Sequence, residues 1–417
     1  MRAFILSTVA IATLALAVPS LGQDKPFAGQ SITVLMPSPQ AATIAADFEA
    51  ATGIKVDLQT LSWDDIRPKL VTALIAGQAP ADVTEFDWSW TGQFAAADWY
   101  LPLNDAIDAD TVSDIKGTTI FTINGNILGV PYTNDFRVML VNKKHFADAG
   151  ITTMPKTLDE LVAAAKAIKE KGIAEYPIGL PLSTTEGAST SWYLLTKAFG
   201  GDLFDADWKP LFVTPDSAGY KALAFEAQLL KDGLVDPAST GLRDSQINDN
   251  MFAKGLASIM ISGEPGRLGQ MNDPAQSQVA GQVEAILVPT ASGVTRSYGL
   301  LEALAIPRAS KNQDAAKEFV KWFTSKDFQV QNYGNGVLPT RTSALDELNK
   351  AGKLQSGDAL VEESKYVEAL FAQGTPTWYP EFSNAVNTAI NAVAKGQITV
   401  DQAMQNIADA TQKAMTE

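Results

Sequence analysis

The group of residues best suited to recognise a ligand is the short segment DWSWT, residues 87–91, which directly follows a predicted strand. Trp88 and Trp90 flank Ser89, and Asp87 precedes them. Tryptophan rings stack on the apolar C–H face of a sugar, and carboxylates accept hydrogen bonds from its hydroxyls. The pattern favours a sugar site in which Trp90 stacks and Asp87 accepts. The alternative is that one or both tryptophans fill the core under a helix.

A second candidate lies in residues 129–146, GVPYTNDFRVMLVNKKHF. Pro131 leads a polar stretch that ends at Asp135, and an apolar strand follows at residues 138–141. A proline-led polar segment between two apolar runs allows the chain to change direction, and a buried strand can then begin a second layer. We predict that the chain crosses here from one lobe to another, with Asp135 facing the space between them. A solvated turn before an ordinary strand would give the same pattern.

The third candidate is the loop SGEPGR, residues 262–267, which ends a strand predicted at residues 257–261. Its glycines and proline allow the backbone to approach a ligand closely, so Gly263 and Glu264 are candidates. Arg267 could donate to hydroxyls or to a carboxylate, or it could be a solvated side chain on a surface turn. The remaining candidates occupy loops or crossings: Ser38, Gln40, Glu186, Tyr298 and Trp378.

The helices and strands predicted around these residues indicate an α/β fold. Residues 31–36, 40–52 and 54–58 form a strand, a helix and a strand, which predicts parallel pairing with a right-handed crossover. Ligands of such sheets bind beyond the carboxyl ends of the strands, where Ser38 and Gln40 follow the first strand. The sequence also predicts a hairpin turning at Asn124-Gly125 and a helix-capping box at Thr157 and Glu160.

The order of strands and helices predicts two interleaved lobes and a helical C-terminal tail. We assign residues 23–133 and 287–337 to the first lobe, and residues 134–286 and 338–417 to the second. Several crossings between two lobes make a hinge. A helix is predicted at residues 217–231, with one face directed inward: Tyr220, Leu223, Ala224, Ala227 and Leu230.

Composition narrows the partners and the compartment. The net charge of −15 over 417 residues argues against nucleic acids and anionic membranes. The absence of cysteine excludes disulfides, thiolate zinc sites and an N-terminal lipid anchor. Residues 1–22 have a cationic start, an apolar run too short to span a bilayer, and small residues before Gly22. We expect a signal peptide cleaved near Gly22 and a mature protein in the periplasm.

A secreted carbohydrate hydrolase or lyase remains open, because such enzymes use paired carboxylates. Glu85, Asp87, Asp135, Glu186 and Glu264 are available for that role. The single histidine, His145, lies among lysines and is expected to be solvated, which argues against a histidine-based triad.

We see no metal-ligand cluster with suitable spacing and no phosphate-binding glycine loop, so no cofactor is expected. A polyamine binder also remains open, with Asp87, Trp88, Trp90 and Asp135 as its acids and aromatics.

Seven segments, in order, carry a family resemblance: FEAATGIKV (48–56), APADV (79–83), VPYTNDFRVMLVNKKHFADAGI (130–151), PKTLDEL (155–161), FAKGLASIMISG (252–263), LPTR (338–341) and GQITVDQAM (396–404). The chain resembles the extracellular solute-binding proteins of bacterial ABC importers, the cluster that includes maltose-binding protein. The resemblance covers the whole mature chain. It implies a type II periplasmic-binding-protein fold whose lobes close on a sugar, and a monomer that docks on a membrane permease.

The resemblance also suggests site residues. Asp135 matches the family's acidic sugar ligand after the crossover, and Ser89 and Trp90 fall in the loop after the third strand. The 263–267 loop and the start of the helix at Phe382 would supply contacts from the second lobe. Pro265 and Arg267 stand where an aromatic residue is expected, and Ser383 where a tryptophan is expected. These departures disfavour a long malto-oligosaccharide and favour a mono- or disaccharide or a related polyol.

Overall fold

The computed structural model describes residues 25–37, 40–291, 293–333 and 337–417. The predicted signal peptide, residues 1–22, and Ser38 lie outside these ranges. No helix within them is long and apolar enough to cross a membrane.

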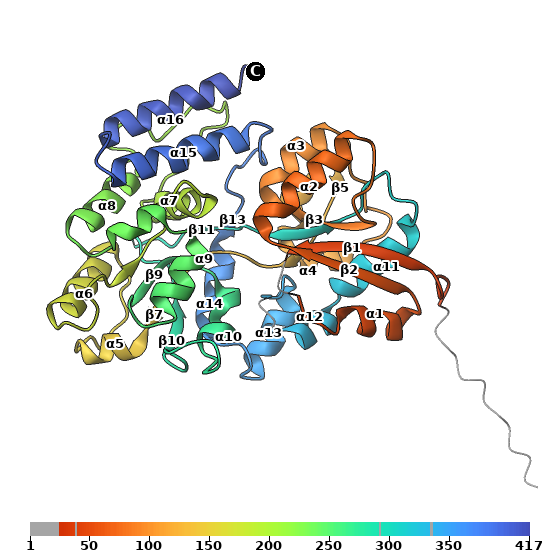
Figure 1. Ribbon diagram of the computed structural model, residues 1–417, viewed down its shortest axis with the longest axis horizontal. Helices are drawn as coiled ribbons and strands as arrows, with labels where there is room; N and C mark the ends of the chain where they lie inside the picture. Colours follow the sequence, from red (N-terminus) through yellow and green to blue (C-terminus); the bar gives the residue numbers. More distant parts are fainter. Residues whose placement is uncertain (1–24, 38–39, 292, 334–336) are drawn as a thin grey trace, which may run out of the picture.

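The first lobe is built on a five-stranded sheet with the order β2-β1-β3-β12-β6, of which Figure 1 labels β1, β2 and β3. β1 pairs in parallel with β2 and β3, whereas β12 runs antiparallel to β3 and β6. The predicted strand–helix–strand unit is therefore confirmed. The bounds are β1 Ser31–Pro37, α1 Ile44–Thr52, β2 Lys55–Leu61, α2 Trp63–Ile75, β3 Val83–Asp87, β6 Val130–Thr133, β12 Glu302–Ala305, α11 Gln313–Phe323 and α12 Lys326–Asn332.

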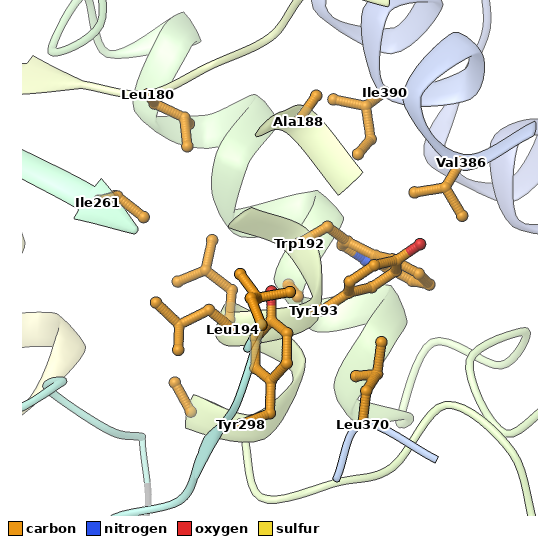
Figure 2. Close-up of a cluster of buried hydrophobic side chains, with 14 of the residues drawn as sticks. Leu180, Ala188, Trp192, Tyr193, Leu194, Ile261, Tyr298, Leu370, Val386 and Ile390 are labelled. Atoms are coloured by element: carbon orange, nitrogen blue, oxygen red, sulfur yellow. The ribbon is translucent and has the colours of Figure 1, made fainter. Parts of the chain in front are cut away.

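The second lobe is built on a four-stranded sheet with the order β10-β7-β9-β8. Its central helix, α7, is buried along its length from Gly187 to Ala198. Such a helix must pack on all sides. Figure 2 shows Trp192 and Tyr193 of α7 among side chains from the sheet and the C-terminal helices. The bounds are β7 Val138–Asn142, α5 Lys143–Asp148, α6 Leu158–Glu170, β8 Ile178–Gly179, α7 Glu186–Ala198, α8 Ala218–Lys231, β9 Ile259–Gly263 and β10 Val283–Ile286.

The remaining elements are short connections and the predicted helical tail, which is confirmed. They are η1 Trp88–Trp90, α3 Thr91–Ala96, α4 Ala109–Asp114, η2 Lys116–Phe121, β4 Thr122–Ile123, β5 Asn126–Ile127, η3 Pro237–Gly241, α9 Asp244–Ile247, η4 Asn248–Phe252, η5 Pro265–Arg267, α10 Leu268–Met271, β11 Ser297–Tyr298, α13 Thr342–Lys350, α14 Gly357–Glu363, η6 Ser364–Tyr366, β13 Val367–Glu368, α15 Tyr379–Ala394 and α16 Val400–Ala414.

Local sequence signals are confirmed where they act over a few residues. Asn124 and Gly125 have φ values of 50° and 80°, and they join the antiparallel strands β4 and β5. Positive φ at both central residues matches a hairpin turn of the I′ type. Thr157 and Glu160 form both halves of the capping box of α6. These features depend only on neighbouring residues, which is why the pattern predicts them.

The predicted inward face of α8 is confirmed in part, because Leu223 is buried and Tyr220 and Leu230 are partly buried against the core. The buried residues of this helix are Gly219, Ala222, Leu223, Glu226 and Leu229, so only Leu223 of the predicted set is among them. Glu226 is an acidic residue outside the predicted apolar face. Its side chain faces apolar residues of α15, with which it lines a small cavity.

The segments that join the two sheets lie side by side. The Asn134 N–H donates to Leu338 O at 2.8 Å, and the Leu300 N–H donates to Asp135 O at 2.8 Å. The first crossing therefore contacts both the second and the third, although residues 334–336 of the third lie outside the described ranges. Few residues connect the sheets, which is the arrangement expected of a hinge.

Residues that follow the predicted boundary at residue 287 contact a segment near the C-terminal part of the chain. The Val288 N–H donates to Glu363 at 3.2 Å, and Arg296 pairs with Glu368 at 2.5 Å. Both partners lie in or after α14, on the side of the second sheet. The lobe boundaries stay a prediction.

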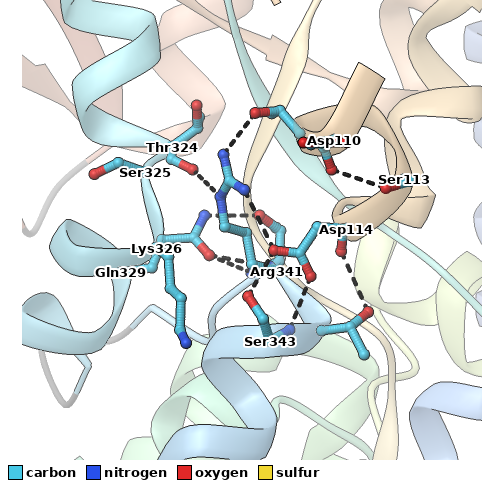
Figure 3. A network of polar contacts seen from close by, with 12 residues as sticks. Asp110, Ser113, Asp114, Thr324, Ser325, Lys326, Gln329, Arg341 and Ser343 are labelled. Atoms are coloured by element: carbon cyan, nitrogen blue, oxygen red, sulfur yellow. Dashed lines mark hydrogen bonds and ion pairs between the residues drawn. The ribbon is translucent and has the colours of Figure 1, made fainter. Parts of the chain in front are cut away.

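Arg341, at the end of the third crossing, is the centre of a polar network (Figure 3). Its Nε donates to Thr324 O at 2.6 Å, its guanidinium pairs with Asp114 at 3.3 Å, and its Nη2 donates to the Thr111 hydroxyl at 2.9 Å. The Arg341 N–H donates to Gln329 at 3.0 Å. The arginine thus ties the crossing to α4 and to the end of α11.

Replacing Arg341 with alanine should lower the free energy of unfolding by about 2–3 kcal/mol, because it leaves the partly buried Asp114 without its cation. Chemical denaturation measures the loss. Arg308→Ala is the matched control, since Arg308 pairs with Asp98 in an exposed bridge, and it should cost about 1 kcal/mol or less. Equal losses in the two variants would show that the network contributes no more than a surface pair.

Glu226 should make stability depend on pH. Its side chain is 1% exposed, and neither carboxylate oxygen has a hydrogen-bond partner among the described residues. Burial raises the pKa of Glu226 well above its ordinary value. Because the folded-state pKa exceeds the unfolded one of about 4.3, the penalty is absent below that pH and grows as pH rises toward the folded pKa.

Relative to the wild type, Glu226→Gln should gain on the order of 1–3 kcal/mol of unfolding free energy between pH 4 and pH 8. Urea denaturation at several pH values measures this difference. A constant difference across the range would mean that Glu226 titrates normally.

Candidate functional site

Three carboxylates converge at the carboxyl end of β3. Glu85 and Asp87 lie on one face of that strand and are 0% and 3% exposed. Glu302, the first residue of β12, is the register partner of Asp87. One carboxylate oxygen from each of the three lies within 4.8 Å of the others. We call Glu85, Asp87 and Glu302 the carboxylate trio.

Uncharged hydrogen-bond donors, a hydroxyl and a backbone N–H, contact the trio. The Tyr132 hydroxyl lies 2.8 Å from Glu85 Oε2 and 2.7 Å from Glu302 Oε2, and the Ser89 N–H donates to Asp87 Oδ1 at 2.8 Å. Burial raises the pKa of Asp87 and of Glu302 to about 7 in each case, against the opposing effect of these hydrogen bonds. Burial and the neighbouring Glu302 raise the pKa of Glu85 well above its ordinary value. Burial therefore shifts all three carboxyl groups of the trio toward their protonated forms.

Arg137 is the buried cation of the first crossing. Its guanidinium pairs with Asp135 at 3.2 Å and with Glu264 of the second lobe at 3.1 Å. Burial raises the pKa of Asp135 to about 7 despite the nearby Arg137. Burial also favours the neutral form of Glu264, but Arg267 and Arg137 together outweigh it and lower the pKa of Glu264 to about 2. Glu264 is therefore ionised at neutral pH and shared between two arginines.

The predicted loop of the second lobe has its own ion pairs. Arg267 Nε lies 2.7 Å from Glu264 and Nη1 lies 3.4 Å from Asp249. Gly263 has a packing reason for its identity: an added Cβ would lie 2.5 Å from Leu140 Cγ. The left-handed backbone belongs instead to Ser262, with φ 61°. The glycine thus serves the contact between β9 and β7.

Glu186, at the start of α7, is held by the tail helix. The hydroxyls of Tyr379 and Ser383 both donate to its carboxylate, the latter at 2.6 Å. Burial raises the pKa of Glu186 against these hydrogen bonds. The Tyr379 ring also meets the Trp88 ring edge-on, with centroids 4.9 Å apart. A ring from each lobe and a second-lobe carboxylate are thus brought together.

The other predicted aromatic residues pack into cores. Trp90 is 2% exposed and lies between Trp63 and Phe94, with ring centroids at 5.9 and 5.7 Å. Trp378 contacts Phe204 and Trp208 inside the second lobe. These placements match the alternative in which the tryptophans fill the core rather than stack on a ligand, because aromatic rings of the protein already pack against both of them.

Other predicted residues have protein partners. The Tyr298 hydroxyl donates to Thr190 O at 2.7 Å, and Gln40 Nε2 donates to Pro37 O at 2.9 Å. His145 is not solvated as expected: its Nδ1 lies 2.8 Å from the Ser258 hydroxyl, and burial lowers its pKa.

Sequence reasoning missed three residues of the site: Glu302, Tyr132 and Arg137. Tyr132 and Glu302 are 170 residues apart and meet only because β6 and β12 pair in one sheet. The acidic residue at the start of a buried strand was the available signal for Glu302. Arg137, two positions after Asp135, carried a similar signal, since a buried arginine requires a carboxylate partner.

Comparisons with known proteins identify the family of this chain. Residues 33–330 match the family described as bacterial extracellular solute-binding protein. The chain belongs to this family. This solute-binding protein is 28% identical over 437 residues to the diacetylchitobiose binding protein DasA of Streptomyces coelicolor, with 97% of each chain covered. It is 28% identical over 347 residues to a probable amino-acid ABC transporter periplasmic-binding protein, y4oP, of Sinorhizobium fredii, covering 78% and 75% of the two chains.

A solved structure supports the same conclusion. The ABC transporter solute binding protein of Thermotoga lettingae, bound with alpha-D-tagatose, superposes with a TM-score of 0.82 at 26% identity, covering 93% of this chain and 100% of the other. The predicted family and the two-lobed type II periplasmic-binding-protein fold are therefore confirmed.

Asp87 should make the solute-binding protein less stable at neutral pH than at acidic pH. Its folded-state pKa of about 7 exceeds the unfolded value of about 3.9, so stability is lost as pH rises between these values. In Asp87→Asn the free energy of unfolding should fall by on the order of 2 kcal/mol less than in the wild type as pH rises. Calorimetric melting from pH 4 to pH 8 measures this difference.

Asp114 provides a control of opposite sign. Hydrogen bonds from Ser343 and Arg341 outweigh burial and lower the pKa of Asp114, so its contribution is present above about pH 3.9 and is lost as pH falls through the folded value. Asp114→Asn should therefore lose stability relative to the wild type at neutral pH. Parallel pH profiles for the wild type and Asp87→Asn would show that Asp87 is ionised throughout.

Proposed function

We propose that this protein is the periplasmic substrate-binding component of an ABC importer. It binds a mono- or disaccharide or a related polyol between its lobes and delivers it, as a monomer, to the membrane permease without chemical turnover. The observation that carries the proposal is the meeting of buried carboxylates, arginines and aromatic rings from both lobes beside the crossings. Such a set can surround a small hydroxylated ligand and exclude water from it.

The roles follow from the contacts. Asp87, Asp135 and Glu186 accept hydrogens from ligand hydroxyls, and Arg267 donates. Trp88 and Tyr379, one from each lobe, form the apolar walls that contact the C–H face of the ring. Trp90 packs between Trp63 and Phe94 and is given no contact with the ligand.

Relatives support the class of ligand and of activity. The Streptomyces protein is described as binding diacetylchitobiose, and the Thermotoga protein holds tagatose. All three relatives are described as binding proteins, in line with binding rather than hydrolysis or elimination by the carboxylates. Lobe closure uses the crossings, where hydrogen bonds between the three segments confine the motion to few residues.

Isothermal titration of purified protein against monosaccharides, disaccharides and polyols tests the proposal. At least one should bind with a Kd below about 1 mM, equivalent to about −4 kcal/mol. Native mass spectrometry of the freshly purified protein should identify a retained ligand of the same class. Turnover of a glycoside, or ligand only of another class, would contradict the proposal.

Asp135→Asn should weaken binding of that ligand by about 1–3 kcal/mol, because it removes a charged acceptor while keeping the size of the side chain. Asp98→Asn is the control, since Asp98 forms an exposed bridge to Arg308 on the first lobe and should bind as the wild type does. Unchanged affinity in Asp135→Asn, with lower stability, would assign Asp135 to holding Arg137 alone.

A further inference from the structure

The carboxylate trio lacks a cationic partner. Within the described ranges, no lysine or arginine forms an ion pair with Glu85, Asp87 or Glu302. Arg67 interacts electrostatically with Asp87, and Arg137 with Glu302, at longer range only. Buried carboxylates are ordinarily paired with a cation or protonated. The trio therefore differs from Glu264, which two arginines neutralise.

Hydrogen bonding leaves the trio incompletely satisfied. The Tyr132 hydroxyl has one hydrogen, yet it lies within hydrogen-bond distance of both Glu85 and Glu302. One of the two contacts therefore requires a proton on a carboxyl group or an external donor. Glu85 Oε1 is buried and has no hydrogen-bond partner in the described structure. An acceptor in a fully buried side chain remains open, which native proteins normally avoid.

The spacing of the trio fits a nitrogen that donates three hydrogens. Three oxygens no more than 4.8 Å apart can all lie within about 2.8 Å of one common centre, which is the usual N–H···O distance. A primary ammonium has three N–H donors and one positive charge. A calcium ion instead needs six to eight oxygen ligands at roughly 2.3–2.6 Å, whereas the hydroxyl hydrogens of Tyr132 and Ser89 already contact the trio.

We propose, on the basis of the binding function proposed above, that the ligand is a polyhydroxylated compound carrying a protonated primary amine, and that the trio binds the ammonium group. The hydroxyls of such a ligand are left to Asp135, Glu186 and Arg267. The charges around Asp87 fit this assignment, because Asp135 and Glu186 add negative potential there, whereas at Glu302 the effects of Glu264 and Arg137 oppose each other. When the ammonium binds, protons held by the trio are released to solvent.

Matched pairs of ligands test the inference by calorimetry at pH 7: D-glucosamine against D-glucose, and D-glucamine against D-sorbitol. The amine should bind at least tenfold more tightly than its neutral partner in one of the pairs. Repeating the titration in buffers of different ionisation enthalpy should show proton release with the amine only. N-acetyl-D-glucosamine, which keeps the nitrogen but loses its charge, should behave as a neutral ligand.

The outcomes separate this inference from the proposed function. A neutral sugar or polyol that binds at least as tightly as its amine would overturn the inference and leave the function standing. Failure of every pair, together with no hydroxylated ligand retained through purification, would overturn both. Binding of Ca²⁺ alone, in competition with the amine, would assign the trio to a metal ion and overturn the inference.

Glu302→Gln should reduce the amine-to-neutral affinity ratio at least tenfold and abolish proton release. Glu226→Gln is the matched control, a buried acid in the second lobe that should leave the ratio unchanged. An unchanged ratio in Glu302→Gln would overturn the assignment. Should Glu302→Gln fail to fold, the ligand pairs and the proton release of the wild type decide the question.

Discussion

The buried ion pairs of Arg137 with the carboxylates of Asp135 and Glu264 are the interaction on which the geometry around the first crossing depends. It links the first crossing to the loop after β9. Breaking a buried pair costs about 3–5 kcal/mol, because the remaining charge loses its partner. The arginine therefore fixes where the crossing segment meets the second lobe. Asp135 and Glu264 are held in fixed positions beside the crossing as a result.

The low polarity that strengthens this pair also explains the behaviour of the carboxylates around it. Carboxylates without an adjacent cation, such as Asp87 and Glu302, shift toward their neutral forms, while Glu264 beside two arginines stays ionised. A protein selected only for stability would not bury so many acids together. Their presence is consistent with a binding site whose acids are completed by hydrogen-bond donors or a positive charge of a ligand.

The two tryptophans of η1 pack in different environments. Trp90 packs between Trp63 and Phe94, while Trp88, two residues earlier, meets Tyr379 of the other lobe. The one-turn η1 helix separates the directions of the two side chains, so two residues of one type meet different neighbours. The sequence shows two similar tryptophans, and only the packing distinguishes their environments.

The sequence alone determined the fold class, the strand–helix–strand unit, the Asn124-Gly125 turn and the capping box at Thr157. These features depend on periodicity or on residues within a few positions, and the order of seven family segments extends them to the whole chain. Asp87, Asp135, Glu186 and Glu264 were also identified as candidates, because acids at strand ends and loops are visible in the sequence.

Only the tertiary structure brought Glu302 and Tyr132 together, because they lie on paired strands 170 residues apart. The structure also shows that Glu226 is buried and that Gly263 packs closely against Leu140. Both placements depend on residues that another helix or strand brings opposite them. A sequence shows which side chains are able to become buried or to form hydrogen bonds. Which of them do so is decided by partners that the chain supplies from distant segments.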